Sequence, residues 1–220
     1  MTIKLSIAFD SLFRQRAAEI ERTGYPEVQI NVVWSAPGAE SERVMENEFK
    51  GLLPFVLHDA INHIGRIYLT QTVIKTGGTP RVRRFWNFSI DAIKEALINA
   101  IFHQSYEEPT PVEVQVTRRE ISILSFPGPD PSIRMEDVQA GRAVSLPHRN
   151  HRIGEILKEL DLAEGRSTGI PKMLEAVRKN GSPVPIFESD ERRTWFLVRL
   201  PVHEQTCPGP GESETVEIST

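Results

Sequence analysis

Four polar side chains recur at a spacing of four within one strongly apolar stretch, residues 90–103. They are Asp91, Glu95, Asn99 and His103. Residues four apart lie above one another on a helix, so the four form a single polar stripe. The side of an ordinary amphipathic helix that carries such a stripe faces water. Because this stripe is narrow and its flanks are apolar, we expect it to face a cleft, where unpaired polar groups would be costly to bury.

The middle of the stripe has the residue types of a metal–nucleotide site. The side-chain oxygen of Asn99 can bind a Mg²⁺ ion that also binds phosphates, since hard cations prefer oxygen ligands. Glu95 lies one turn earlier and can orient or deprotonate a water molecule. The spacing therefore predicts a metal-assisted phosphate chemistry, with a plain solvent-facing stripe as the alternative.

Two glycine-containing segments could border such a site. Gly165, Thr168 and Gly169 precede an expected helix, where glycine permits close backbone approach and helix amides favour phosphate. No Walker sequence occurs in the chain, so a simple turn between helices is the alternative. Gly128 follows an expected strand, where it either shapes the edge of a pocket or ends the strand.

Hydrophobic periodicity places these residues on helices, strands and loops. The pattern predicts helices over 3–21, 52–69, 89–106, 153–160 and 170–179, and strands over 28–34, 112–117, 120–124 and 194–200. Ser89 is the expected N-cap of the central helix, and Gly181 is the expected stop of the last one. Loops are expected over 35–42, 76–84, 127–132 and 135–148. The order of the elements predicts an α+β protein, a two-layer sandwich whose mainly antiparallel sheet is covered by helices on one face.

Composition narrows the class of protein. The 220 residues carry a net charge of −4, which becomes −1 without the three acidic residues of 205–220, so no global basic field for nucleic acid is present. The one cysteine, Cys207, allows no internal disulfide, as is common in reducing compartments. No signal peptide and no apolar run of membrane-spanning length is found. We therefore expect a cytoplasmic protein without a membrane partner.

Three segments, taken in order, resemble a known family. They are KEALINAIFHQSY at 94–106, ISILSFPGP at 121–129, and RNHRI at 149–153 followed by EGRSTGI at 164–170. This trio is similar to the ATP-binding domain of RecG-like and Schlafen/AlbA-type transcriptional regulators. That domain is a divergent member of the GHKL superfamily of gyrase, heat-shock chaperone, histidine kinase and MutL ATPases. The resemblance spans roughly residues 48–201 and implies the Bergerat α/β sandwich.

The resemblance also assigns roles to residues. It implies ATP and Mg²⁺ as ligands, Asn99 as the metal ligand and Glu95 as the general base. It places Gly165, Thr168 and Gly169 beside the phosphates, and makes residues 130–164 a lid in which Arg149 contacts phosphate. His103 matches the family's H-x-x-Y pattern, and Gly128 lies where the adenine box ends. That box is D-x-G-x-G in the superfamily but Ser-Phe-Pro-Gly at 125–128 here, without the aspartate.

These observations predict a chain of three parts: a helix–strand extension at 1–44, the ATP-binding domain at 45–203 and an acidic tail at 204–220. We expect a Mg²⁺-dependent ATP-binding module of a RecG-like regulator, with slow or no hydrolysis. One alternative is a non-catalytic module of the same fold that dimerises or binds a partner. Another is DNA binding through Arg81, Arg83 and Arg84, which otherwise lie in a solvated loop before core aromatic residues. Any dedicated DNA-binding module would lie outside this chain.

Overall fold

The computed structural model describes residues 27–35, 44–75, 82–107, 110–143, 150–159 and 169–206. Several sequence predictions fall outside these ranges and are not tested by the structure. They are the helix at 3–21, most of the loop at 35–42, the glycine loop up to Thr168, and the acidic tail beyond Thr206.

A six-stranded mixed sheet forms one layer of the described part of the chain. Its order is β2-β1-β5-β6-β8-β7, in which β1 runs parallel to β5 and every other neighbouring pair is antiparallel. The strands are β1 (Glu27–Ser35), β2 (Val44–Leu52), β5 (Val112–Val116), β6 (Glu120–Ser125), β7 (Ile186–Glu188) and β8 (Phe196–Pro201). A separate antiparallel hairpin consists of β3 (Gln71–Lys75) and β4 (Val82–Trp86).

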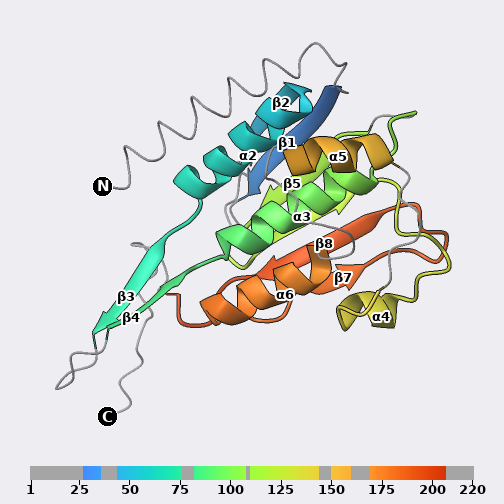
Figure 1. Cartoon of the computed structure of the whole chain (residues 1–220). Coiled ribbons are helices and arrows are strands. Elements are labelled where there is room, and N and C mark those ends of the chain that lie inside the picture. The colour runs from blue at the N-terminus through green and yellow to red at the C-terminus, as the bar shows by residue number, and fades with distance from the viewer. Residues whose placement is uncertain are drawn as a thin grey trace.

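Helices cover one face of this sheet (Figure 1). They are α2 (Leu53–Ile67), α3 (Ile90–His103), α5 (His151–Glu159) and α6 (Gly169–Asn180), while the short α4 (Met135–Gln139) lies beside β7. The uncovered face is polar: on β5, for example, Glu113 and Gln115 are exposed between buried valines. The predicted two-layer α+β sandwich is thus confirmed. Within the described residues, no helix is both long and apolar enough to cross a membrane.

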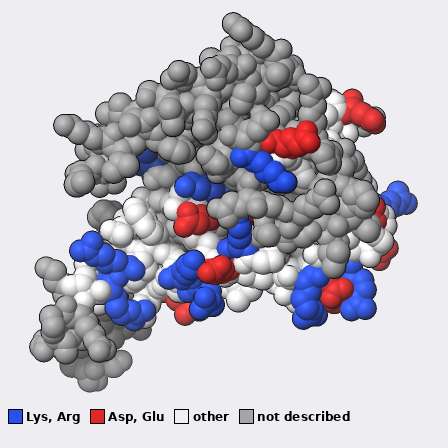
Figure 2. Space-filling view, in the orientation of Figure 1, with Lys and Arg blue, Asp and Glu red and all other residues white. Residues whose placement is uncertain are grey.

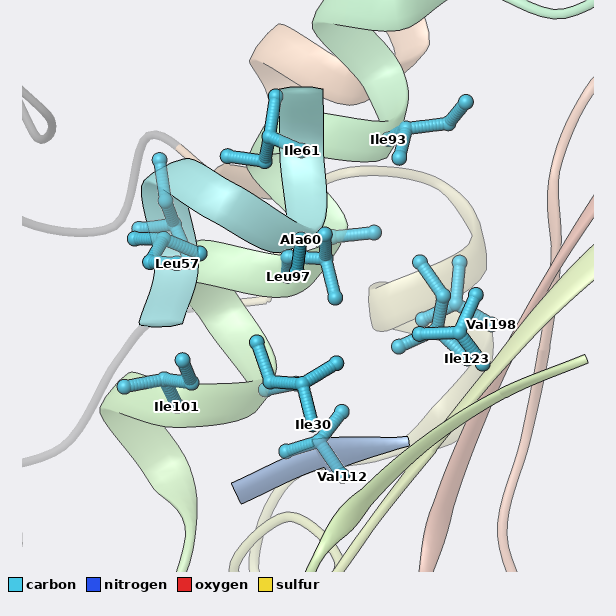
Figure 3. Close-up of a cluster of buried hydrophobic side chains, with 14 of the residues drawn as sticks. Ile30, Leu57, Ala60, Ile61, Ile93, Leu97, Ile101, Val112, Ile123 and Val198 are labelled. Atoms are coloured by element: carbon cyan, nitrogen blue, oxygen red, sulfur yellow. The ribbon is translucent and has the colours of Figure 1, made fainter. Parts of the chain in front are cut away.

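The core lies between α2, α3 and the sheet. Side chains from both helices and from β1, β5, β6 and β8 meet there, as Figure 3 shows. The helix α3 contributes seven buried residues out of its fourteen. Leu97, at its centre, has no exposed surface and faces the sheet residues Ile30 and Ile123, which are also fully or almost fully buried. Burial of this helix therefore holds the two layers together.

The four predicted helices that fall within the described residues, and the predicted hairpin, are confirmed with small shifts of boundary. Ser89 caps α3 as expected, its hydroxyl accepting a hydrogen bond from the amide of Ala92 at 3.4 Å. Gly181 ends α6 with a φ of +80°, a left-handed conformation that favours glycine. The strands β5 and β6 form the expected hairpin.

Other elements differ from the sequence prediction. Strands β2, β3 and β7 and helix α4 were not expected, and β4 occupies residues 82–86, part of which was predicted as loop. Each has a physical reason. β2 is an edge strand of largely exposed residues, so pairing with β1 rather than an apolar face defines it. β7 is an edge strand of only three residues, too short to show a periodic pattern, although its Phe187 is buried. β3 and β4 carry exposed polar residues, and α4 is a single turn.

The strand β1 belongs to the predicted N-terminal extension, yet it lies inside the sheet. It pairs with β2 on one side and with β5 on the other, and Ile30 and Val32 are completely buried. The sheet and its core therefore draw on residues from both sides of the predicted boundary at position 44.

The C-terminal end of α3 is closed by two side chains. The hydroxyl of Tyr106 donates a hydrogen bond to the carbonyl oxygen of Ile101 at 3.0 Å. The side-chain amide of Asn150 donates to the carbonyl oxygens of Phe102 and Gln104, at 3.0 and 2.8 Å. The last turn of a helix leaves carbonyl groups without helical partners, and these two residues satisfy them. Burial raises the pKa of the Tyr106 phenol, so it stays a neutral donor.

Leu97→Ala tests the central role of α3 in the core. The substitution leaves a cavity between the helix and the sheet, so we expect the free energy of unfolding to fall by about 2–5 kcal/mol in urea denaturation. Lys94→Ala, on the exposed side of the same helix, is the control and should cost less than about 1 kcal/mol. Equal losses for the two variants would contradict this account.

Tyr106→Phe tests the closure of α3. Loss of one buried hydrogen bond should lower the free energy of unfolding by about 0.5–1.5 kcal/mol, measured in the same way. Because the pKa of Tyr106 is raised, its phenol should resist ionisation in the folded protein at alkaline pH. A tyrosinate absorbance titration of the wild type minus that of Tyr106→Phe would show this. A difference curve centred near pH 10 would overturn the assignment.

Candidate functional site

The polar stripe of α3 is arranged as the spacing predicts, with its ends exposed and its middle partly covered. Asp91 and His103 are exposed, whereas Glu95 and Asn99 are half-buried. Asp91 lies 4.0 Å from the ammonium group of Lys94, a surface pair of little energetic value. The coverage of the two middle residues comes from neighbouring elements that pack along this side of α3.

The helix α6 provides part of that cover. It lies beside α3 (Figure 1), and its first residue, Gly169, adjoins the carboxylate of Glu95. A Cβ atom built at Gly169 would lie 3.1 Å from Oε1 of Glu95, closer than most real contacts allow. A larger residue would push the carboxylate away. The fold therefore brings together Glu95 and Gly169, two predicted site residues separated by more than seventy positions in the sequence.

Asn99 lies one turn beyond Glu95 on the same side of α3. Within the residues that the structure describes, its carboxamide has no hydrogen-bond partner. A half-buried amide with free oxygen and nitrogen atoms is available to a ligand or to water. Side chains one turn apart are close enough, about 6 Å between Cβ atoms, to act on one small ligand.

No group of three or more His, Cys, Asp or Glu side chains in the described residues could hold a metal ion by itself. A cation at this position would need further oxygen atoms from a ligand or from water. Mg²⁺ is commonly held in this manner, through one or two protein oxygens together with substrate phosphates and water. The donor set around Asn99 thus fits a Mg²⁺–phosphate complex and does not fit an all-protein metal centre.

His103 and Tyr106 lie in different surroundings. His103 is exposed at the end of the stripe, with its ring edge-on to Phe102 at a centroid distance of 4.9 Å. Tyr106 points inward and closes α3, as described above. The tyrosine of the H-x-x-Y pattern is therefore structural, which sequence reasoning left unassigned.

Gly128 is packed against the loop before β8. Its amide donates a hydrogen bond to the carbonyl oxygen of Arg193 at 2.8 Å, and a Cβ atom at this position would lie 2.6 Å from the carbonyl oxygen of Trp195. No side chain fits there, so the requirement for glycine is explained by backbone packing alone. A role of Gly128 in ligand binding stays a prediction.

The three remaining predicted site residues, Arg149, Gly165 and Thr168, lie outside the described residues. Described residues next to two of them contact α3. Asn150, next to Arg149, binds the end of α3, and Gly169, next to Thr168, adjoins Glu95. The amide of Ser105 also donates to the carbonyl oxygen of Phe126 at 3.1 Å, which brings in the loop after β6.

Asn150 is the residue that sequence reasoning passed over. It was quoted within the motif at 149–153 but received no role. Its backbone carbonyl oxygen accepts hydrogen bonds from the amides of Ile153 and Gly154, at the start of α5, while its side chain closes α3. An asparagine directly before an amphipathic stretch is a typical N-cap signal and could have identified the first of these roles. Nothing in the sequence points to the second.

Comparison with known proteins gives one family match and a likeness of fold. Residues 110–200 match the family model described as "Putative ATP-dependent DNA helicase recG C-terminal". The match begins after α3 and therefore does not include Glu95 and Asn99. No curated protein matches the sequence.

One solved structure supports the fold over most of the chain. The crystal structure of the DIP2311 protein from Corynebacterium diphtheriae aligns with a TM-score of 0.59 at 17% identity, covering 80% of this chain. This chain spans only 35% of that protein, and the likeness at such low identity concerns the fold alone. The match at 110–200 supports a divergent ATPase-like domain of the RecG-like type in that part of the chain.

Proposed function

We propose that this chain is a Mg²⁺-dependent ATP-binding module of a RecG-like regulatory protein, with slow or no hydrolysis. One observation carries the proposal. The carboxylate of Glu95 adjoins Gly169 at the start of α6. The carboxamide of Asn99, which has no hydrogen-bond partner among the described residues, lies one turn away. A helix-borne carboxylate and amide beside a glycine at a helix N-terminus can together bind phosphate and Mg²⁺.

In the proposed site, each described residue has a distinct task. The oxygen of Asn99 binds the cation, and the amide nitrogens at the start of α6 point toward the phosphates. Gly169 keeps the space beside Glu95 open for the close approach of the ligand. The bound Mg²⁺ supplies positive charge that neutralises the phosphate oxygens. Glu95 orients a water molecule and accepts its proton.

Recognition of the base is the weak part of the proposed site. The stretch at 125–128 lacks the superfamily's aspartate, and its own groups are used inside the fold. Ser125 is 4% exposed, the carbonyl oxygen of Phe126 accepts from Ser105, and Gly128 is held by Arg193. Weak contacts to the purine fit a module that binds triphosphate with little base selectivity and turns it over slowly.

Asn99→Ala tests metal–nucleotide binding. Mg·ATP at about one hundred times its Kd should stabilise the wild-type chain by about 2.7 kcal/mol, which corresponds to a rise of about 5–10 °C in Tm for a protein of this size. The variant should lose this rise because the cation loses its protein ligand. Differential scanning fluorimetry with Mg·ATP, Mg·GTP and ATP plus EDTA measures the effect.

The matched control is Asn62→Ala, the same substitution at an exposed position of α2. It should keep the full shift with Mg·ATP. A wild-type chain whose Tm does not move with any nucleotide would refute the proposal and leave partner binding by a non-catalytic module. A full shift in Asn99→Ala would refute the role of Asn99.

Glu95→Gln tests the base. The amide keeps the shape of the side chain but cannot accept a proton, so any phosphate release should fall to the background rate while the Mg·ATP shift in Tm remains. Glu175→Gln, an exposed residue of α6 paired with Lys179 at 2.9 Å, is the control and should release phosphate as the wild type does. Unchanged turnover in Glu95→Gln would remove the catalytic role of this carboxylate.

A further inference from the structure

The hairpin of β3 and β4 projects from the sandwich at the end away from β2 (Figure 1). Its strands pair antiparallel over five positions, and neither strand joins the six-stranded sheet. The sequence predicted a solvated loop here, followed by aromatic residues of the core. An ordered two-stranded arm is instead present, and neither the core nor the proposed nucleotide site uses its outer face.

The two faces of the hairpin differ. Phe85 is 3% exposed and stacks on the ring of His203 at a centroid distance of 3.9 Å, so its face is turned toward the body of the protein. Successive residues of a strand point to opposite faces, which places Trp86 and Arg84 on the outer face. Val73 is paired with Arg84 across the strands and shares that face.

The outer face is open to solvent. Trp86 is 37% exposed, Val73 45% and Val82 46%, and Arg84 is exposed beside them. An indole ring at this exposure offers a flat apolar surface within reach of a guanidinium group. Exposed aromatic and aliphatic groups in one patch are unfavourable in water unless a partner covers them.

The position of Trp86 is fixed by its backbone. Its amide donates to the side-chain oxygen of Asn180 at 2.9 Å, and its carbonyl oxygen accepts from the side-chain nitrogen of the same residue at 2.8 Å. The side chain of Asn87 accepts from the amide of Thr70 at 2.8 Å and donates to the carbonyl oxygen of Tyr68 at 2.9 Å. The base of the hairpin is therefore held firmly, which reduces the entropy lost when a partner binds.

All charged residues in and around the hairpin are basic. Residues 68–90 contain no Asp or Glu, while Lys75, Arg81, Arg83 and Arg84 are basic. In Figure 2 the blue atoms of basic side chains lie over the projecting arm, on a chain whose net charge is −4. A concentrated positive charge on an otherwise acidic protein favours an anionic partner. It disfavours pairing with the same hairpin of a second copy, which would bring arginine against arginine.

We propose that the outer face of the β3–β4 hairpin binds single-stranded nucleic acid. A base stacks on the indole of Trp86, and Arg84, on the same face of β4, binds a phosphate of the backbone. Stacking on an aromatic side chain requires an unpaired base whose face is accessible, which a duplex does not offer. An exposed aromatic ring on a backbone that is held in place, with apolar neighbours and an arginine on the same face, is the composition of a single-strand platform. This proposal is independent of the nucleotide site on α3.

Fluorescence anisotropy of a labelled oligo(dT) with the full 220-residue chain tests the proposal. Trp86→Ala should weaken binding about 5- to 150-fold, the loss expected for one stacked base, and Trp86→Phe should restore most of it. Arg84→Glu should weaken binding and lower the slope of log Kd against log salt by about 0.7 or more. Circular dichroism and Tm establish that each variant is folded.

Arg119→Glu, an exposed arginine in the turn between β5 and β6, is the matched control and should bind as tightly as the wild type apart from a small general charge effect. The proposal is overturned if oligo(dT) does not bind, or if Trp86→Ala and Arg84→Glu bind as the wild type does. It is also overturned if a duplex or poly-glutamate binds as tightly as oligo(dT), since the surface would then select charge alone or a different partner.

Discussion

The rest of the structure depends on the burial of α3. This helix is apolar on most sides, with Ala96, Leu97 and Ile101 at or below 1% exposure, so it must be covered by the sheet beneath it and by other helices beside it. Once α2 and the sheet have taken the apolar sides, α6 covers part of the side that carries Glu95 and Asn99. The half-buried setting of these two polar residues follows from a hydrophobic requirement.

The elements that could be predicted from the sequence are those whose own side chains define them. α2 and α3 have long apolar faces, and β5 alternates buried and exposed residues along its whole length. β2 could not be found in this way because it is an edge strand of mostly exposed residues, ordered by its ladder with β1. The hairpin of β3 and β4 was missed for a similar reason: polar residues and an outward-facing Trp86 hide the period of two.

The candidate site also has a part that local sequence pattern predicts and a part that depends on contacts between distant residues. Spacing alone identified the stripe on α3, because four residues make one turn. Spacing could not show that Gly169 would adjoin Glu95, since that approach is made by the packing of two helices far apart in the chain. The closure of α3 by Asn150 is also a long-range contact. The resemblance of three ordered segments linked residues that local pattern could not, and the structure shows two described residues of the third segment, Asn150 and Gly169, in contact with α3.

The two ends of helix α6 contact two different parts of the protein. Its first residue, Gly169, adjoins Glu95, and its last, Asn180, grips the backbone of Trp86 at the root of the hairpin. A helix of twelve residues is about 18 Å long and moves as a stiff rod. Its two ends cannot be displaced independently. One continuous helix therefore borders the proposed nucleotide site at its first residue and anchors the base of the projecting hairpin at its last.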